Sequence, residues 1–261
     1  MNTKKIIYAI ALSVGVVLCL ETCSTTQTID WPEGDVVFIA HRGGKVPGYP
    51  ENTLAAFRQA IKYGVDAIEI DLRGTKDGEV VIIHDETLHR TTNGTGTVGN
   101  HTLAELKKLD AGDGERIPTY EEVLELVNGT GVRLFLDIRV SPTLDKREVV
   151  RLTEEYQATS KVIVGVRTLD DLRAFRNLNP NLLTFGFLSS PVYIELFVQE
   201  GVDIIDLPPR QINANPDLVR DVHQLGKQVW VRAVLGSREE LEQLIELGVD
   251  GITLDLPELI D

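Results

Sequence analysis

Short apolar runs alternate with amphipathic stretches along almost the whole chain. The apolar runs are rich in β-branched residues, as is typical of buried strands, and the stretches between them repeat apolar residues at helical spacing. The pattern predicts strands at Val36–Ala40, Ala67–Arg73, Arg133–Arg139, Lys161–Val166, Leu182–Leu188, Val202–Leu207, Val229–Val234 and Gly251–Leu254. It predicts helices at Thr53–Tyr63, Tyr120–Val127, Asp145–Tyr156, Leu169–Asn177, Pro216–Leu225 and Arg238–Leu247.

This alternation predicts the α/β class, in which helices cover a parallel sheet. Eight predicted strands with helices between most of them, in a chain of 261 residues, favour a closed (β/α)8 TIM barrel over an open, doubly wound sheet. No glycine-rich dinucleotide-binding motif follows the first strand, which also counts against the open sheet. We therefore predict one TIM-barrel domain over residues 36–261.

A further apolar run, Glu79–His84, does not fit as a barrel strand. It follows the second strand too closely for a parallel crossover, and the intervening Asp77-Gly78 is typical of a hairpin turn. We therefore predict a hairpin that projects from the second strand and returns. A turn centred between Asp77 and Gly78 would place His84 opposite Asp71.

The segment that follows, at about residues 85–118, is predicted to be a small lid inserted over the barrel mouth. It contains a stretch rich in Gly and Thr at 91–97 and a short helical pattern at Leu103–Leu109. The glycines are not followed by the Gly-Lys-Ser/Thr of a phosphate-binding P-loop, so that motif is excluded.

The first 23 residues have the pattern of an export signal. Lys4 and Lys5 precede an apolar run from Ile6 to Leu20 that is short for a membrane span, and a polar stretch follows. Cys23 lies where a bacterial lipoprotein is cleaved, although Glu21 and Thr22 are unusual there. Residues 24–35 are predicted to be a tether.

Three fates of this leader remain open: lipid attachment at Cys23, which would anchor the protein to a membrane, simple secretion, and an uncleaved anchor. Each places the folded domain outside the cytoplasm, as an exported lipoprotein or a secreted or periplasmic protein. Both cysteines, Cys19 and Cys23, lie in the leader, so the domain is expected to have neither disulfides nor thiol chemistry. The net charge of −14 argues against nucleic acid as a partner.

Two acidic residues in the second predicted strand are the strongest indication of chemistry. Glu69 and Asp71 lie two apart, so both side chains point to the same face of an apolar strand. Burying two carboxylates together is costly unless a cation accompanies them. Asp137 ends the next barrel strand and is a natural third ligand, although a strand-end aspartate is also typical of a helix N-cap. Oxygen ligands without cysteine indicate Mg²⁺ or Ca²⁺.

Two histidines would supply acid and base beside such a metal. His41 ends the first strand next to Arg42, and His84 ends the predicted hairpin. His41 taken alone is more typical of a hydrogen-bonded core histidine than of a catalytic one. The stretch Glu51-Asn52-Thr53 also has a structural interpretation, as the start of a helix capped by Asn52 or Thr53.

Several ordered motifs resemble those of the glycerophosphodiester phosphodiesterase family. They run from about residue 36 to 255 and are Ile39-Ala40-His41-Arg42-Gly43-Gly44, Pro50-Glu51-Asn52-Thr53-Leu54-Ala55-Ala56-Phe57, Ile68-Glu69-Ile70-Asp71, His84-Asp85, Arg90-Thr91-Thr92-Asn93-Gly94-Thr95-Gly96, Ile117-Pro118-Thr119-Tyr120-Glu121-Glu122 and Gly248-Val249-Asp250-Gly251-Ile252. The resemblance implies a barrel with an inserted lid. It also implies a metal held by Glu69, Asp71 and Asp137, an acid/base pair of His41 and His84, and Arg42 and Glu51 in the site.

The chain departs from the family pattern at two places. The third metal ligand is usually the Glu of a Glu-Ile-Lys, whereas this chain has Asp137-Ile138-Arg139. The shorter Asp requires a closer metal or a bridging water, and Arg139 replaces a point charge with a planar fork. A Thr-Val-Asn of the family is replaced by Ala233-Val234-Leu235, which removes a polar contact.

The implied activity is metal-dependent hydrolysis of glycerophosphodiesters to glycerol 3-phosphate and an alcohol. Arg42 and Arg139 would then face the phosphoryl oxygens. Two alternatives remain open at this stage. The same site could act on lysophospholipids, as a lysophospholipase D does, or on teichoic-acid-type polymers, or the barrel could bind glycerophosphodiesters without cleaving them.

Overall fold

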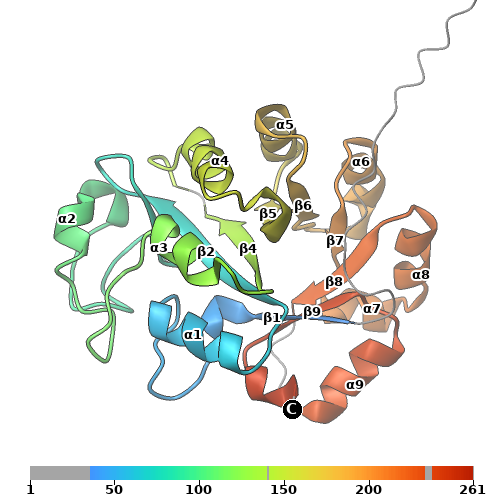
Figure 1. Ribbon diagram of the computed structural model, residues 1–261. Coiled ribbons are helices and arrows are strands. Elements are labelled where there is room, and N and C mark those ends of the chain that lie inside the picture. The colour runs from blue at the N-terminus through green and yellow to red at the C-terminus, as the bar shows by residue number, and fades with distance from the viewer. Residues whose placement is uncertain (1–35, 140, 233–236, 261) are drawn as a thin grey trace, which may run out of the picture.

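Eight parallel strands in the described part of the chain close into a barrel with the helices outside it (Figure 1). The computed structural model describes residues 36–139, 141–232 and 237–260. The ring closes because β1 pairs with both β2 and β9. The barrel strands are β1 (Val37–Ala40), β2 (Ala67–Gly74), β4 (Arg133–Ile138), β5 (Val162–Val166), β6 (Leu183–Gly186), β7 (Ile204–Asp206), β8 (Gln228–Arg232) and β9 (Gly251–Leu254). The predicted TIM barrel is confirmed.

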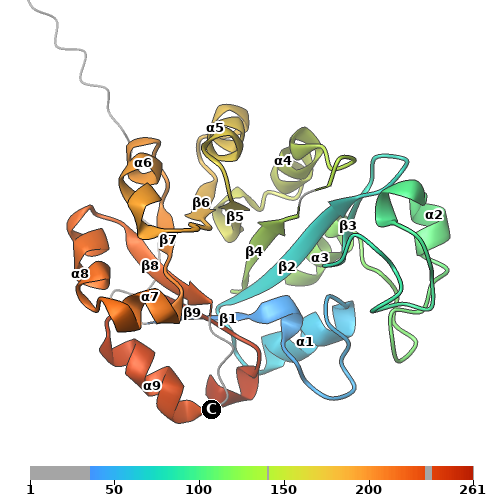
Figure 2. The same cartoon turned by 180° about the vertical axis from the view of Figure 1, so that it is seen from behind.

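The helices form the outer layer of the ring in both views (Figures 1 and 2). They are α1 (Leu54–Lys62), α2 (Leu103–Leu106), α3 (Tyr120–Val127), α4 (Lys146–Glu155), α5 (Leu169–Leu178), α6 (Ile194–Gln199), α7 (Pro209–Ala214), α8 (Asp217–Gln224) and α9 (Arg238–Glu246). The short helices α6 and α7 were not predicted, because neither is long enough to show a helical repeat of apolar residues. None of the described helices is long and apolar enough to cross a membrane.

An aromatic cluster fills the interior of the barrel. The rings of Phe135 and Phe185 lie 4.6 Å apart, and both pack against Trp230, which is fully buried. Phe135 lies two residues before Asp137 on β4, so this layer is one step deeper than the carboxyl ends of the strands. The interior is therefore solid, and chemistry is confined to the mouth.

The hairpin after β2 is present, but its register differs from the prediction by one residue. The strand β3 (Val80–Ile82) pairs with β2 in antiparallel fashion, with Leu72 opposite Ile82. The amide of Ile83 donates to the carbonyl of Asp71 at 2.9 Å, so Ile83 rather than His84 lies opposite Asp71. The reversal is centred on Asp77 because the loop has three residues rather than two.

The segment after β3 has a small core of its own. Seven apolar side chains pack together under it: Val81, Ile83, Leu88, Val98, Leu106, Ala111 and Ile117. The segment, with α2 and the hairpin, projects from one side of the ring (Figure 1). The cluster fixes the path of the chain that leads from β3 to α3, and so the position of His84. The predicted leader and tether lie outside the described residues.

Candidate active site

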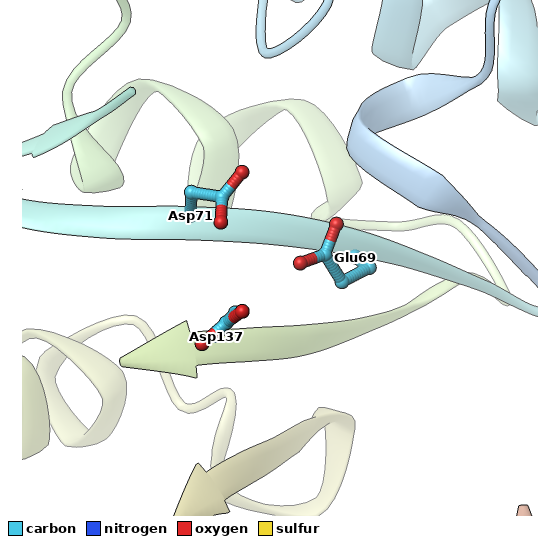
Figure 3. Close-up of side chains that lie close together, drawn as sticks. All are labelled: Glu69, Asp71 and Asp137. Atoms are coloured by element: carbon cyan, nitrogen blue, oxygen red, sulfur yellow. The ribbon is translucent and has the colours of Figure 1, made fainter. Parts of the chain in front are cut away.

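Three carboxylates from neighbouring strands meet at the barrel mouth (Figure 3). Asp71 on β2 and Asp137 on β4 are partners in the parallel register, and Glu69 lies one layer deeper on β2. The longer side chain of Glu69 compensates for its depth. Each residue offers one oxygen, and these oxygens all lie within 4.8 Å of one another. All three side chains are buried. The three residues lie in one cluster, as the sequence predicted.

Burial and mutual repulsion raise the pKa values of two of the three carboxylates. Burial, and then repulsion by Asp71 and Asp137, hold the pKa of Glu69 well above its ordinary value. Burial and the charge of Asp137 likewise raise the pKa of Asp71, against the opposing effects of Asn52 and Arg42. A divalent cation between the carboxylates would relieve both effects.

Asp137 differs from the other two because arginines hold both of its oxygens. Arg167 donates to Oδ1 at 2.6 Å and to Oδ2 at 2.9 Å, and Arg139 donates to Oδ2 at 2.9 Å. Burial alone would raise the pKa of Asp137, but these bonds and charges outweigh burial and lower the pKa. Arg139 thus lies at the mouth as predicted, whereas Arg167 was not identified from the sequence.

The residues present fit a divalent metal ion. Asp71 Oδ1 is buried and accepts no hydrogen bond from the described residues. Glu69 accepts one at Oε2, from the amide of Arg42 at 3.0 Å. An oxygen-only ligand set with this spacing suits the hard cations Mg²⁺ and Ca²⁺. Asp137 could join such a site by exchanging part of its contact with arginine.

His41 is held by a residue that follows the last barrel strand, β9. Its Nδ1 lies 2.6 Å from Oδ1 of Asp255, which directly follows β9 and is buried. Asp255 also pairs with Lys45 at 2.7 Å. A carboxylate at Nδ1 favours a proton on that nitrogen and leaves Nε2 free to accept one. The His41 side chain is 27% exposed, so it is not a fully buried core histidine.

His84 has the same arrangement with a local partner. Its Nδ1 lies 2.6 Å from Oδ1 of Asp85, and Asp85 is bound by Arg90, which also binds Glu51. The guanidinium of Arg73 donates twice to the carbonyl of His84, at 3.0 and 2.8 Å.

Arg42 and Asn52 both contact the carboxylate of Asp71. Both have positive φ, 53° and 57°, which is uncommon for residues other than glycine and typical of functional sites. Arg42 pairs with Asp71 at 3.2 Å and with Glu51 at 3.0 Å. Asn52 donates to Asp71 at 2.8 Å.

Residues 51–53 serve both as the start of a helix and as part of the site. Thr53 is the cap of α1, and its hydroxyl accepts from the amide of Ala56. Asn52 and Glu51 belong to the site, through the contacts just described. The sequence could have indicated Asp255, because it ends the last strand in the same way as Asp137 ends its own. Arg90 begins one of the motifs that resemble the family but was given no role in the site, and nothing in the sequence linked Arg167 to the site.

Comparison with known proteins gives one consistent result. Residues 41–259 match the glycerophosphoryl diester phosphodiesterase family. A glycerophosphodiester phosphodiesterase of Caldanaerobacter subterraneus subsp. tengcongensis is 37% identical over 234 residues, which cover 85% of this chain and 95% of that protein. One of Bacillus altitudinis is 33% identical over 237 residues, which cover 84% of this chain and 94% of that protein.

Solved structures agree with this result. A glycerophosphodiester phosphodiesterase of Agrobacterium tumefaciens superposes with a TM-score of 0.78 at 27% identity, covering 86% of this chain and 98% of that one. An Oleispira antarctica phosphodiesterase, solved with the product sn-glycerol-3-phosphate, superposes with a TM-score of 0.73 at 26% identity, covering 86% and 94%. Taken with the mouth geometry, these matches show that the chain belongs to the glycerophosphoryl diester phosphodiesterase family.

Proposed function

We propose that the protein is a metal-dependent glycerophosphodiester phosphodiesterase that releases glycerol 3-phosphate and an alcohol. The single observation that supports it most is the pairing of both mouth histidines, through Nδ1, with carboxylates beside a buried acidic triad. A phosphodiester needs proton transfer at two oxygens, and two oriented imidazoles match that need. The names of the relatives, and the glycerol 3-phosphate bound to the Oleispira antarctica enzyme, support the same substrate class.

Glu69, Asp71 and Asp137 would hold a Mg²⁺ or Ca²⁺ ion. When bound, such an ion polarises a phosphoryl oxygen and orients the substrate. The fit is supported by the unbonded Asp71 Oδ1 and by the raised pKa values of Glu69 and Asp71.

The two histidines would divide the proton transfers. With Nδ1–H directed at Asp255 or Asp85, the Nε2 atom of one neutral imidazole takes the proton from the attacking hydroxyl or water. The other histidine, protonated at Nε2, gives its proton to the leaving alcohol oxygen. Each carboxylate partner stabilises the imidazolium form of its histidine and prevents rotation of the ring.

Arg42 and Arg139 would bind the phosphoryl oxygens through charge-assisted hydrogen bonds. Arg42 is held by Asp71 and Glu51, and Glu51 in turn by Arg90, so the guanidinium has one orientation before substrate arrives. Glu51 would act on the substrate through this arginine. The family resemblance implies Glu51 as a substrate-binding residue, and this arrangement would give it that role by positioning Arg42.

The proposal extends to location. The leader pattern, with Cys23 as a lipid attachment site, supports export and membrane anchoring of the domain. Labelling with a radioactive fatty acid, lost in Cys23→Ala, would support anchoring. Unlabelled wild-type protein would exclude it.

The function is tested by incubating chelator-treated protein with glycerophosphoglycerol and measuring glycerol 3-phosphate. We expect no release until Mg²⁺ or Ca²⁺ is added, and release thereafter. Glu69→Gln, which keeps the shape of the side chain and removes its charge, should lower the metal affinity measured by calorimetry. Release that is unaffected by the chelator would exclude the metal, and no release with any divalent cation would exclude the activity.

A further inference from the structure

A cationic pocket opens beside Asp137, between the ends of β4 and β5. Its volume is about 390 Å³, and three of its lining residues are basic and one is acidic. The polar lining consists of Arg139, Ser141, Lys146, Arg167, Thr168 and Asp171. In a chain with a net charge of −14, this local excess of positive charge is unusual and focuses the field on an anion.

Arg167 is rigidly oriented at the inner wall of this pocket. It binds both oxygens of Asp137 and the carbonyl of Ile138 at 3.1 Å, and its guanidinium lies 4.1 Å from the ring centroid of Phe187. Its side chain is nevertheless 32% exposed, so one edge faces the pocket. A guanidinium already fixed in this way loses little entropy when it binds an anion.

Arg139 and Lys146 extend the positive charge outward. Within the described part of the chain, Arg139 donates hydrogen bonds through Nη1 alone, which leaves its Nε and Nη2 for a ligand. The ammonium of Lys146 pairs with Asp171 on the pocket wall. With Asp137 counted, two acidic residues oppose three basic ones, and the hydroxyls of Ser141 and Thr168 add neutral partners.

The same neighbourhood is poorly suited to a cationic group. Phe187 is only 8% exposed, and a second guanidinium, that of Arg232, lies 4.5 Å from its ring centroid. The ring face that could hold a quaternary ammonium is thus covered by arginine. Because Arg139 and Arg167 line the pocket and both contact Asp137, the pocket adjoins the proposed metal site.

We propose that this pocket receives a second anionic group of the substrate, a phosphate or carboxylate beyond the diester that is cleaved. The preferred substrates are then glycerophosphodiesters with an additional negative charge on the part that extends past Asp137. The inference rests on the proposed function and adds a specificity site to it, with Arg167 and Lys146 as its selective residues.

The test compares glycerophosphoglycerol with the same compound phosphorylated on its terminal hydroxyl, in wild type and in Lys146→Gln. We expect wild type to favour the phosphorylated compound about tenfold in kcat/KM at low salt, the effect of a partly screened ion pair, and to lose that preference at high salt. The ratio should fall to near one in Lys146→Gln. Lys62→Gln, at an exposed lysine in the last turn of α1, is the matched control and should retain the wild-type ratio.

Affinities measured by calorimetry for the same two compounds keep the two proposals distinguishable. Tighter binding of the phosphorylated compound without turnover of either would leave the pocket supported and exclude the hydrolase. Equal kcat/KM and equal affinity for both compounds in wild type would overturn the pocket alone. A wild-type preference that persists in both Lys146→Gln and Arg167→Gln would also overturn it.

Discussion

Two histidine–aspartate pairs lie at opposite ends of the strand β9. At its carboxyl end, His41 Nδ1 contacts Asp255 at 2.6 Å, and the Asp255 side chain is 3% exposed. Before its amino end, His223 Nε2 contacts Asp250 at 2.8 Å, and the Asp250 side chain is 30% exposed. The pairs are alike in chemistry and differ in surroundings, since only the first lies at the mouth with the acidic triad.

The difference shows that a histidine–aspartate pair is not in itself a site. Asp250 also accepts the amide of Val229 at 2.7 Å, so it joins two strands at the base of the barrel and serves stability. Asp255 holds the Nδ1 of His41, which leaves the Nε2 of this ring directed away from its partner. In a TIM barrel, position at the carboxyl end of a strand separates catalytic from structural polar residues.

Replacing the two histidines gives the largest expected contrast. His41→Ala should lower kcat about 10³-fold through loss of one proton-transfer group, while metal affinity measured by calorimetry stays near the wild-type value. His223→Ala, at the other end of β9, should retain wild-type kcat. Near-normal turnover in His41→Ala would remove this residue from the mechanism.

The two aspartates should separate activity from stability. Asp255→Asn should lower kcat about 10²-fold, because the amide no longer holds the required tautomer and orientation of His41. Asp250→Asn should retain kcat and lower the free energy of unfolding by about 1 kcal/mol, the typical value of a lost hydrogen bond. Equal kcat values in the two variants would contradict the comparison.

The partner of His84 is expected to matter less than that of His41. The Asp85 side chain is 26% exposed, and the carbonyl of His84 is held independently by Arg73. Asp85→Asn should therefore lower kcat by about tenfold, within the range for residues that orient a catalytic group. Glu86→Gln, at the exposed neighbouring residue, is the control and should be close to wild type. A loss in Asp85→Asn larger than that in Asp255→Asn would reverse the proposed order.

The smallest expected effect is a loss of stability at acidic pH through Asp255. Burial alone would raise the pKa of Asp255, but its contacts with His41 and Lys45 outweigh burial and lower it. A carboxylate with a lowered pKa stabilises the fold above its unfolded pKa of about 4, and this contribution is lost as pH falls through the folded-state pKa.

Urea unfolding of wild type and Asp255→Asn measures that contribution. The difference in free energy of unfolding between the two proteins should be present at pH 6 and smaller at pH 3. The same difference at both pH values would contradict the role assigned to the Asp255 contacts.

Much of the fold was predictable because alternating apolar runs and amphipathic stretches determine a barrel. The acidic triad was predictable for a related reason, since residues at the ends of parallel strands converge whatever the loops do. The register of the hairpin was not predictable. It depends on whether the loop around Asp77 contains two residues or three, and that difference shifts His84 by one position.

The missing site residues share a different cause. Asp255 reaches His41 because the ring closes and brings β9 beside β1, whereas Arg167 reaches Asp137 across the neighbouring strands β4 and β5. Arg90 reaches Glu51 from the inserted segment. The contacts of Arg90 and Arg167 depend on the three-dimensional path of long side chains, which neither spacing nor periodicity encodes.

A crystal structure of the protein with Mn²⁺ and glycerol 3-phosphate would test the central claim most directly. We expect one anomalous peak at about 2.2 Å from an oxygen of each of Glu69, Asp71 and Asp137, with the Nε2 atoms of His41 and His84 facing the bound phosphate. A peak at another position, with Asp137 still bound only to its arginines, would contradict it.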